Sequence, residues 1–104
     1  MSNFNEAYSF LISIGVVNSQ EEFSSRFLSK SPRYYAMLKA TGREPSVEAI
    51  ATLASRMVDV GRNLKSSRYG NILNDGETAE KLSQKLWNTV YRQSLARDAH
   101  VRGK

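Results

Sequence analysis

The sequence contains no cysteine, two prolines and a single histidine. Without cysteine there is no disulfide framework and no thiolate metal ligand, which fits a reducing cytoplasm. His100 has no partner at metal-ligand spacing, so we predict no metal site. The most apolar run, residues 10–17, is far shorter than the roughly 20 residues of a transmembrane helix. The N-terminus also lacks the basic and apolar segments of a signal peptide, so we expect a cytoplasmic protein that does not enter a membrane.

Patterns that carry catalysis are also missing. The acidic residues are scattered, and no pair of them is placed to act as general acid and general base. No glycine-rich loop for binding phosphate is present. We therefore predict that the protein is not an enzyme and needs no cofactor.

Positive charge is in excess. Fifteen Lys and Arg residues stand against ten Asp and Glu, giving a net charge of +5 and a pI near 9.7 in a chain of 104 residues, the size of one domain. Such an excess favours an anionic partner, most commonly nucleic acid. The alternative is a charged surface that serves only solubility.

Apolar residues recur at steps of three and four along almost the whole chain, which is typical of amphipathic helices. We predict an all-α fold, a small bundle of about five helices. Residues 1–65 would form a helix-turn-helix domain, and residues 66–104 would supply a loop, a C-terminal helix and a fraying basic tail. The expected helices cover residues 4–15, a segment from about 20, 31–41, 46–64 and 77–97.

Local signals place the ends of these helices. Ser19 and Glu22 have the spacing of a capping box, in which each side chain bonds the other residue's amide. Ser46 is a second expected N-cap, and Gly61 is an expected bend or end of the fourth helix. Residues 66–77 hold two glycines and an Asn-Asp-Gly turn signal, so we expect a loop there.

In the short helix predicted at residues 31–41, the signals for the start and the end of the helix lie close together along the chain. Ser31 is the expected N-cap, Pro32 fits the first helical position, and Gly42 ends the helix. A helix this short is marginal alone, so it must be held from behind. The spacing turns Tyr35 and Leu38 toward the core. The opposite face then carries Arg33, Ala36, Met37 and Ala40.

Residues 20–57 resemble the lambda-repressor-like (Cro/CI, XRE) helix-turn-helix family. The resemblance rests on "SQEEFS" at residues 19–24, on Ser31 with Tyr35 four positions later, and on "GREPSVEAIATLA" at residues 42–54. Two departures stand out. One extra residue lies between Phe23 and Ser31, so the second helix is longer or its turn is reshaped. Ser29 replaces the glycine that the family usually places in the turn, where left-handed geometry is needed.

The resemblance implies a small sequence-specific transcriptional regulator that binds double-stranded DNA as a homodimer. Arg33 would be the only strong reader of bases, best suited to guanine, because Pro32 and Ala36 can only touch a thymine methyl group. Gln20 would meet a phosphate or brace the recognition helix, and Arg43 would meet the DNA backbone. The candidate DNA-binding residues are Gln20, Lys30, Ser31, Arg33, Tyr34, Met37 and Arg43.

The C-terminal helix has two interpretations. Its apolar residues could pack on the other helices, or they could form the dimer interface, which we favour. The residues of the predicted interface are Leu82, Leu86, Trp87, Val90 and Tyr91. A second function also stays open: a module that grips a protein partner with the same fold, since the smooth, partly apolar face of the short helix suits a protein groove.

Overall fold

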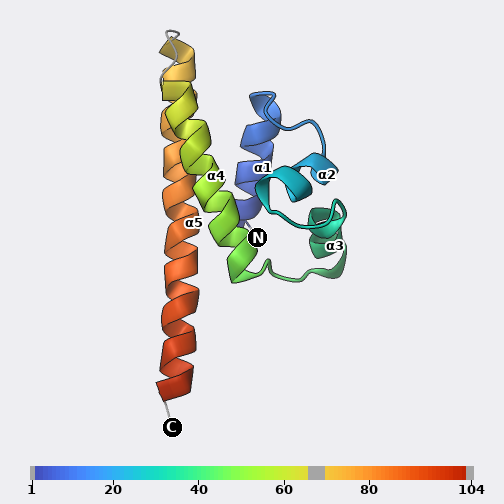
Figure 1. The fold of residues 1–104 in the computed structure, drawn as a ribbon, viewed down its shortest axis with the longest axis vertical. Coiled ribbons are helices and arrows are strands. Elements are labelled where there is room, and N and C mark those ends of the chain that lie inside the picture. The colour runs from blue at the N-terminus through green and yellow to red at the C-terminus, as the bar shows by residue number, and fades with distance from the viewer. Residues whose placement is uncertain (1, 66–69, 103–104) are drawn as a thin grey trace.

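The computed structural model describes residues 2–65 and 70–102. This part of the chain contains helices and no strand, so the all-α prediction is confirmed (Figure 1). No helix in it combines the length and the apolarity that crossing a bilayer would require. In chain order the elements are α1 (Ser2–Ser13), α2 (Gln20–Glu22), the π-helical segment η1 (Phe23–Phe27), α3 (Tyr34–Thr41), α4 (Val47–Lys65) and α5 (Gly70–Arg102).

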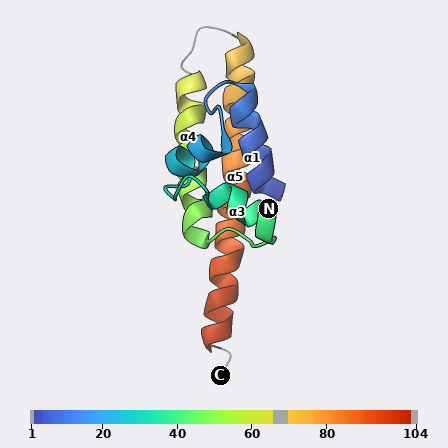
Figure 2. The ribbon, with the colours of Figure 1, turned by 90° about the vertical axis from the view of Figure 1, so that its right-hand side faces the viewer.

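Helices α4 and α5 run antiparallel and side by side, and the four shorter segments lie on one side of this pair, where α1 contacts α5 and η1 contacts α4 (Figure 1). With 33 residues, α5 is about 50 Å long at the usual rise per residue. Its C-terminal end extends beyond the rest of the molecule in both views (Figures 1 and 2). The molecule is therefore elongated and measures 55 × 26 × 19 Å. Helix α3 lies on the side that faces away from α5 (Figure 1).

Helices α4 and α5 pack closely at Gly61 and Gly76. The helix boundaries predicted in this region were wrong. Helix α4 passes through Gly61 without ending, and α5 starts at Gly70 instead of residue 77, so most of the expected loop is helix. The other part of that loop, residues 66–69, lies outside the described residues. A Cβ atom on Gly61 would lie 3.2 Å from the Gly76 carbonyl oxygen and 3.0 Å from Glu80 Cγ. The glycines permit close helix packing, which outweighs their turn preference.

The C-terminal boundary also differs from the prediction. Helix α5 continues to Arg102, whereas we expected it to end near residue 97 and the basic tail to fray. No glycine or proline interrupts residues 77–102, and Gly103 follows directly. Because those two residue types are the strongest helix breakers, the backbone can remain helical up to that point.

The core next to α3 is built from aromatic rings of three helices. The Tyr35 ring centroid lies 5.0 Å from that of Phe23, 4.9 Å from that of Tyr8 and 6.2 Å from that of Phe4. Phe23 and Phe27 are buried, and so are Tyr35 and Leu38, as the spacing of the latter two predicts. Burial raises the pKa of the Tyr35 phenol above its ordinary value, with Tyr8 adding to the shift. Tyr35 therefore stays neutral and donates its O–H to Asn5 Oδ1, 2.5 Å away.

Candidate nucleic-acid interface

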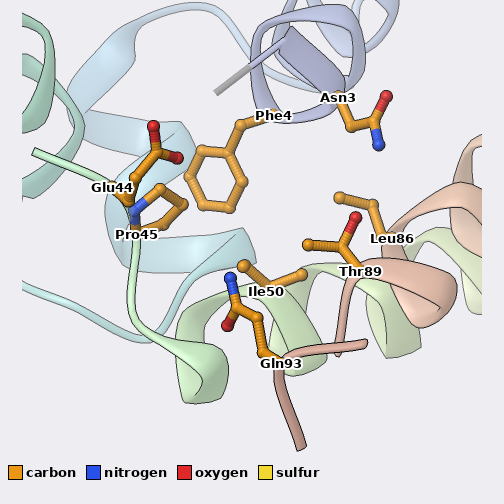
Figure 3. A pocket seen from close by; sticks show the side chains of 8 residues that line it. All are labelled: Asn3, Phe4, Glu44, Pro45, Ile50, Leu86, Thr89 and Gln93. Atoms are coloured by element: carbon orange, nitrogen blue, oxygen red, sulfur yellow. The ribbon is translucent and has the colours of Figure 1, made fainter. Parts of the chain in front are cut away.

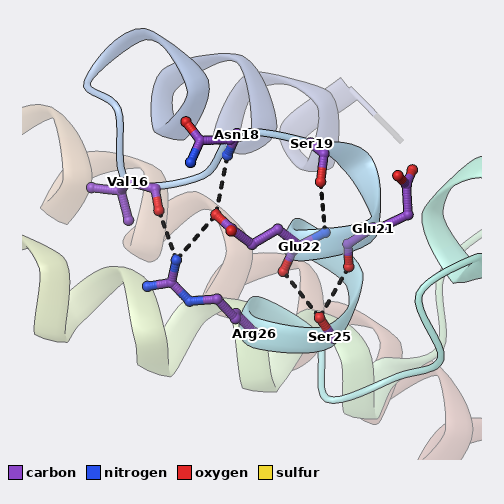
Figure 4. Close-up of polar contacts among 7 residues, drawn as sticks. All are labelled: Val16, Asn18, Ser19, Glu21, Glu22, Ser25 and Arg26. Atoms are coloured by element: carbon purple, nitrogen blue, oxygen red, sulfur yellow. Dashed lines mark hydrogen bonds and ion pairs between the residues drawn. The ribbon is translucent and has the colours of Figure 1, made fainter.

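The helix that precedes the turn is capped at Ser19. The Glu22 N–H donates to Ser19 Oγ at 3.1 Å, which confirms the predicted N-cap (Figure 4). The reciprocal half of the capping box is shifted by one residue, because Glu22 Oε1 accepts from the Asn18 N–H at 3.1 Å. Arg26 Nη1 donates to the same carboxylate oxygen at 3.1 Å and to the Val16 carbonyl at 2.9 Å. Arg26 thus braces the loop after α1 and is bound within the protein.

The helix before the turn widens at η1, close to where the sequence has one residue more than the lambda-repressor-like pattern. This segment, Phe23–Phe27, is π-helical, and a π turn holds one residue more than an α turn. The wider turn keeps both Phe23 and Phe27 buried. Within it, the Ser25 hydroxyl donates to the Glu21 carbonyl at 3.0 Å (Figure 4). Of the two outcomes considered for the insertion, a longer helix or a reshaped turn, the structure has a widened helix followed by a tight turn.

The turn between η1 and α3 depends on Ser29. Its φ of +54° lies in the left-handed region, which residues other than glycine rarely adopt. The Lys30 N–H donates to the Ser24 carbonyl at 3.1 Å and folds the chain back toward η1. From the neighbouring helix, Arg56 Nη2 reaches Ser29 Oγ at 3.4 Å. Nothing in the sequence singled out Arg56, which, like Arg62, is an exposed arginine on α4.

The start of α3 differs from the prediction. Ser31 does not cap it and Pro32 is not its first residue, because the helix begins at Tyr34. The Tyr34 N–H instead donates to the Ser31 carbonyl at 3.0 Å, which closes a turn with Pro32 and Arg33 at its centre. Arg33 has φ −92° and ψ 0°, the values expected at the third position of a type I turn.

A buried serine on η1 replaces the missing cap. Ser24 Oγ accepts the Tyr35 N–H at 3.0 Å, and both residues are buried. This bond satisfies an amide of the first turn of α3 and ties the two helices of the motif together. The sequence offered one signal for it, a small polar residue at an otherwise apolar position.

The far end of α3 is held by its connection to α4. Gly42 ends α3 with φ +68°, and Ser46 Oγ accepts the Ala49 N–H at 3.1 Å, so both predicted boundaries are confirmed. The Ser46 N–H donates to the Tyr34 hydroxyl at 3.1 Å. Buried Pro45 sits beside a cavity of about 180 Å³ between this connection, the start of α1 and α5 (Figure 3).

The outward face of α3 carries Arg33, Ala36, Met37 and Ala40, all exposed as predicted. The side chain of Met37 is 44% exposed, unusual for a large apolar residue. Lys39 extends its Nζ to 5.5 Å from the centre of the Tyr35 ring. Its aliphatic chain therefore lies along the apolar side of the helix while its charged end stays exposed.

The surroundings of α3 are strongly basic. No Asp or Glu occurs between Glu22 and Glu44, whereas five Lys and Arg residues do. Lys30 is half-buried, with its Nζ 5.7 Å from the Tyr34 ring centre and 4.0 Å from a carboxylate oxygen of Glu48. Within the described part of the chain, Arg33 forms no ion pair. The face is thus positive, with one arginine free to bind.

The structure brings together most of the predicted DNA-binding residues. Ser31, Arg33 and Met37 are exposed on or just before α3, and Arg43 is exposed directly after it. The side chains of the remaining three are half-buried: Gln20 at the start of α2, and Lys30 and Tyr34 beside the turn.

The structure buries some residues of the predicted dimer interface and leaves others exposed. Leu82 and Leu86 are buried in the chain's own core, 5% and 1% exposed, so they must be removed from the interface. Val90 is partly buried and packs against the same core. Trp87 and Tyr91 remain 41% and 66% exposed on the outer face of α5.

A family model matches residues 4–100, nearly the whole of the chain. The chain belongs to the DUF6626 family. That family is described as one of unknown function, so the likeness of residues 20–57 to lambda-repressor-like proteins stays a prediction. No curated protein and no solved structure matches the chain.

Proposed function

We propose that this DUF6626 protein is a sequence-specific DNA-binding transcriptional regulator that places α3 in the major groove. The observation that carries the proposal is the outward face of α3, where the unpaired Arg33 is exposed within a stretch, residues 23–43, that has five Lys and Arg residues and no Asp or Glu. A helix with this exposure fits the width of the major groove. Its position on the far side of the molecule from α5 leaves room for a duplex (Figure 1).

The packing behind α3 supports the same use. Tyr35 and Leu38 anchor its inner side, and the bond between Ser24 and the Tyr35 N–H fixes its start. A recognition helix must be rigid, because misplacing a side chain by a fraction of an ångström weakens a bidentate contact to a base. Lys30 and Arg43 lie before and after the helix, where cations can meet the phosphates that border a groove.

The two arginines are expected to contribute differently to binding. Arg33→Ala should lower affinity for the preferred sequence by about 1–3 kcal/mol and erase the preference at one base pair, because a bidentate contact to guanine is lost. Arg43→Ala should weaken all sequences alike and reduce the salt dependence of binding, because only a phosphate contact is lost. Selection from a random duplex library, followed by titration of the selected site in several salt concentrations, measures both effects.

Arg62→Ala is the matched control for these variants. Arg62 is an exposed arginine in the last turn of α4. The opposite, N-terminal end of α4 is the one nearer α3 (Figure 1). Its loss should change affinity little. If Arg33→Ala and Arg62→Ala behaved alike on the selected site, α3 would not be the reading helix.

We also propose that two copies associate through the outer face of α5. Trp87 and Tyr91 are one helical turn apart and both exposed, and large aromatic residues commonly anchor protein interfaces. Paired copies would read two half-sites of a palindromic DNA sequence. Val90 would lie at the edge of this contact, since it is partly covered by its own chain.

Replacing both Trp87 and Tyr91 with serine is expected to convert a dimer to a monomer while the helix content stays unchanged. Ile12→Ser is the control, since Ile12 is 37% exposed on α1 and outside the proposed contact. Molar mass measured by sedimentation equilibrium over a range of concentrations gives the result. A wild-type chain that remains monomeric at high concentration would contradict the proposal.

A second candidate function follows from the same face of α3. Ala36, Met37 and Ala40 offer no hydrogen-bonding group, and an apolar helix face can also fit the groove of a protein partner. The library selection separates the two candidates. Enrichment of a sequence supports the regulator, whereas uniform, weak binding to every sequence supports the interaction module.

A further inference from the structure

We infer that α3 selects its DNA site largely through the methyl groups of thymine, beside a single guanine read by Arg33. The inference rests on the proposed function and specifies the kind of sequence that it requires. Some side chains of α3 already interact within the protein, and the others are left for a ligand.

Most polar side chains of α3 are engaged within the molecule. The Thr41 hydroxyl donates to the Met37 carbonyl at 2.7 Å, and the Tyr34 hydroxyl accepts the Ser46 N–H at 3.1 Å. Lys39 lies over the Tyr35 ring. Of the polar groups at or near the exposed stripe, Arg33 and the hydroxyl of Ser31 are left for bases.

The remaining stripe is apolar. At 100° per residue, Ala36, Met37 and Ala40 lie on one side of the helix, and all three are exposed. Arg33, in the turn just before the helix, is exposed as well. From Ala36 to Ala40 the apolar stripe is about 6 Å long, which corresponds to about two base pairs. The stripe therefore matches one short half-site.

The chemistry of the major groove then limits the sequence. Thymine alone presents a methyl group there, and alanine and methionine can contact it but cannot hydrogen-bond any base edge. Arginine pairs best with O6 and N7 of guanine. Cytosine or adenine opposite the stripe would have its amino group dehydrated without a partner, which is unfavourable. The positive charge around α3 makes duplex DNA, not an apolar protein groove, the occupant that we infer.

Thymine and uracil differ only by the methyl group, so deoxyuridine is the direct probe. Selection should be run in parallel from two random duplex libraries, one made with thymidine and one with deoxyuridine. We expect the thymidine library to yield a site with one guanine next to thymines. Replacing single thymines of that half-site with deoxyuridine should weaken binding about fourfold for each methyl group that contacts α3. Substitutions outside the half-site serve as controls.

Variants of Met37 tie the effect to the helix. Met37→Ala should weaken binding and abolish the penalty of deoxyuridine at one position, whereas Met37→Leu should keep it, since apolar bulk remains. Ile12→Ala, at an exposed apolar residue on α1, should leave the penalty unchanged. Met37 is exposed, so thermal unfolding should show the same stability for all these chains.

The outcomes separate this inference from the proposed function. If a site is selected and its deoxyuridine form binds equally well, the methyl-reading inference is overturned and DNA binding stands. If neither library yields an enriched sequence, both are overturned. Thymine-specific weakening that disappears with Met37→Ala supports both.

Discussion

Replacing Tyr35 with alanine is expected to remove about 3–5 kcal/mol from the free energy of unfolding, as for other large buried aromatic side chains. Tyr35 is 1% exposed and its ring contacts the rings of Phe4, Tyr8 and Phe23. Its loss leaves a cavity where α1, η1 and α3 meet. Small domains are stable by about 5–15 kcal/mol, so the variant would lose a large part of its stability.

Urea unfolding followed by circular dichroism measures this loss, and Tyr35→Phe is the matched control. Phenylalanine keeps the ring contacts and removes only the hydroxyl that donates to Asn5. Asn5 is exposed and can bind water instead, so we expect a cost of about 0.5–1.5 kcal/mol. A cost below about 1 kcal/mol for Tyr35→Ala would mean that the aromatic cluster does not hold α3 in place.

The Tyr35→Ala variant also distinguishes residues that hold α3 in place from residues that contact DNA. Alanine at position 35 keeps its N–H, so the bond to Ser24 is still chemically possible. The bond forms, however, only while α3 stays docked on η1. Because an undocked α3 cannot present Arg33 at a fixed angle, affinity for a selected site should fall together with stability. Arg33→Ala, by contrast, should lose affinity and keep its stability, since Arg33 is exposed.

Helix boundaries were predictable from the sequence wherever one residue and its neighbours determine them. The caps at Ser19 and Ser46 and the end at Gly42 all depend on local backbone geometry. The buried side of α3 was predictable for the same reason, because helical spacing alone turns Tyr35 and Leu38 inward.

The predictions that were wrong concern features that residues distant in the sequence determine. Ser31 has the composition of an N-cap, yet Ser24, eleven residues from Tyr35, supplies the oxygen. Leu82 and Leu86 share a helix with Trp87, but only packing on the other helices determines which of these residues is covered. At Gly76 a turn signal lies within a helix because contact with α4 overrides it.

The contact between α4 and α5 leads to the second prediction. Gly61→Leu is expected to destabilise the protein by about 1–3 kcal/mol, the usual cost of forcing extra atoms into a packed core. Even the Cβ atom would lie 3.2 Å from a backbone carbonyl oxygen that cannot move without shifting α5. The gain in helix propensity on replacing glycine, at most about 1 kcal/mol, offsets only part of this cost.

Ser55→Leu provides the control, because Ser55 is exposed on the same helix and its replacement by leucine gains propensity of the same sign, although less than at glycine. Thermal unfolding should show a lower Tm for Gly61→Leu, by about 4–8 °C per kcal/mol for a domain near this size, and an unchanged or slightly higher Tm for Ser55→Leu. An equal response of the two variants would show that α5 does not pack against Gly61. Helix α5, which starts where a loop was expected, would then need another explanation, and the outer face proposed for dimerisation would not be held in its present orientation.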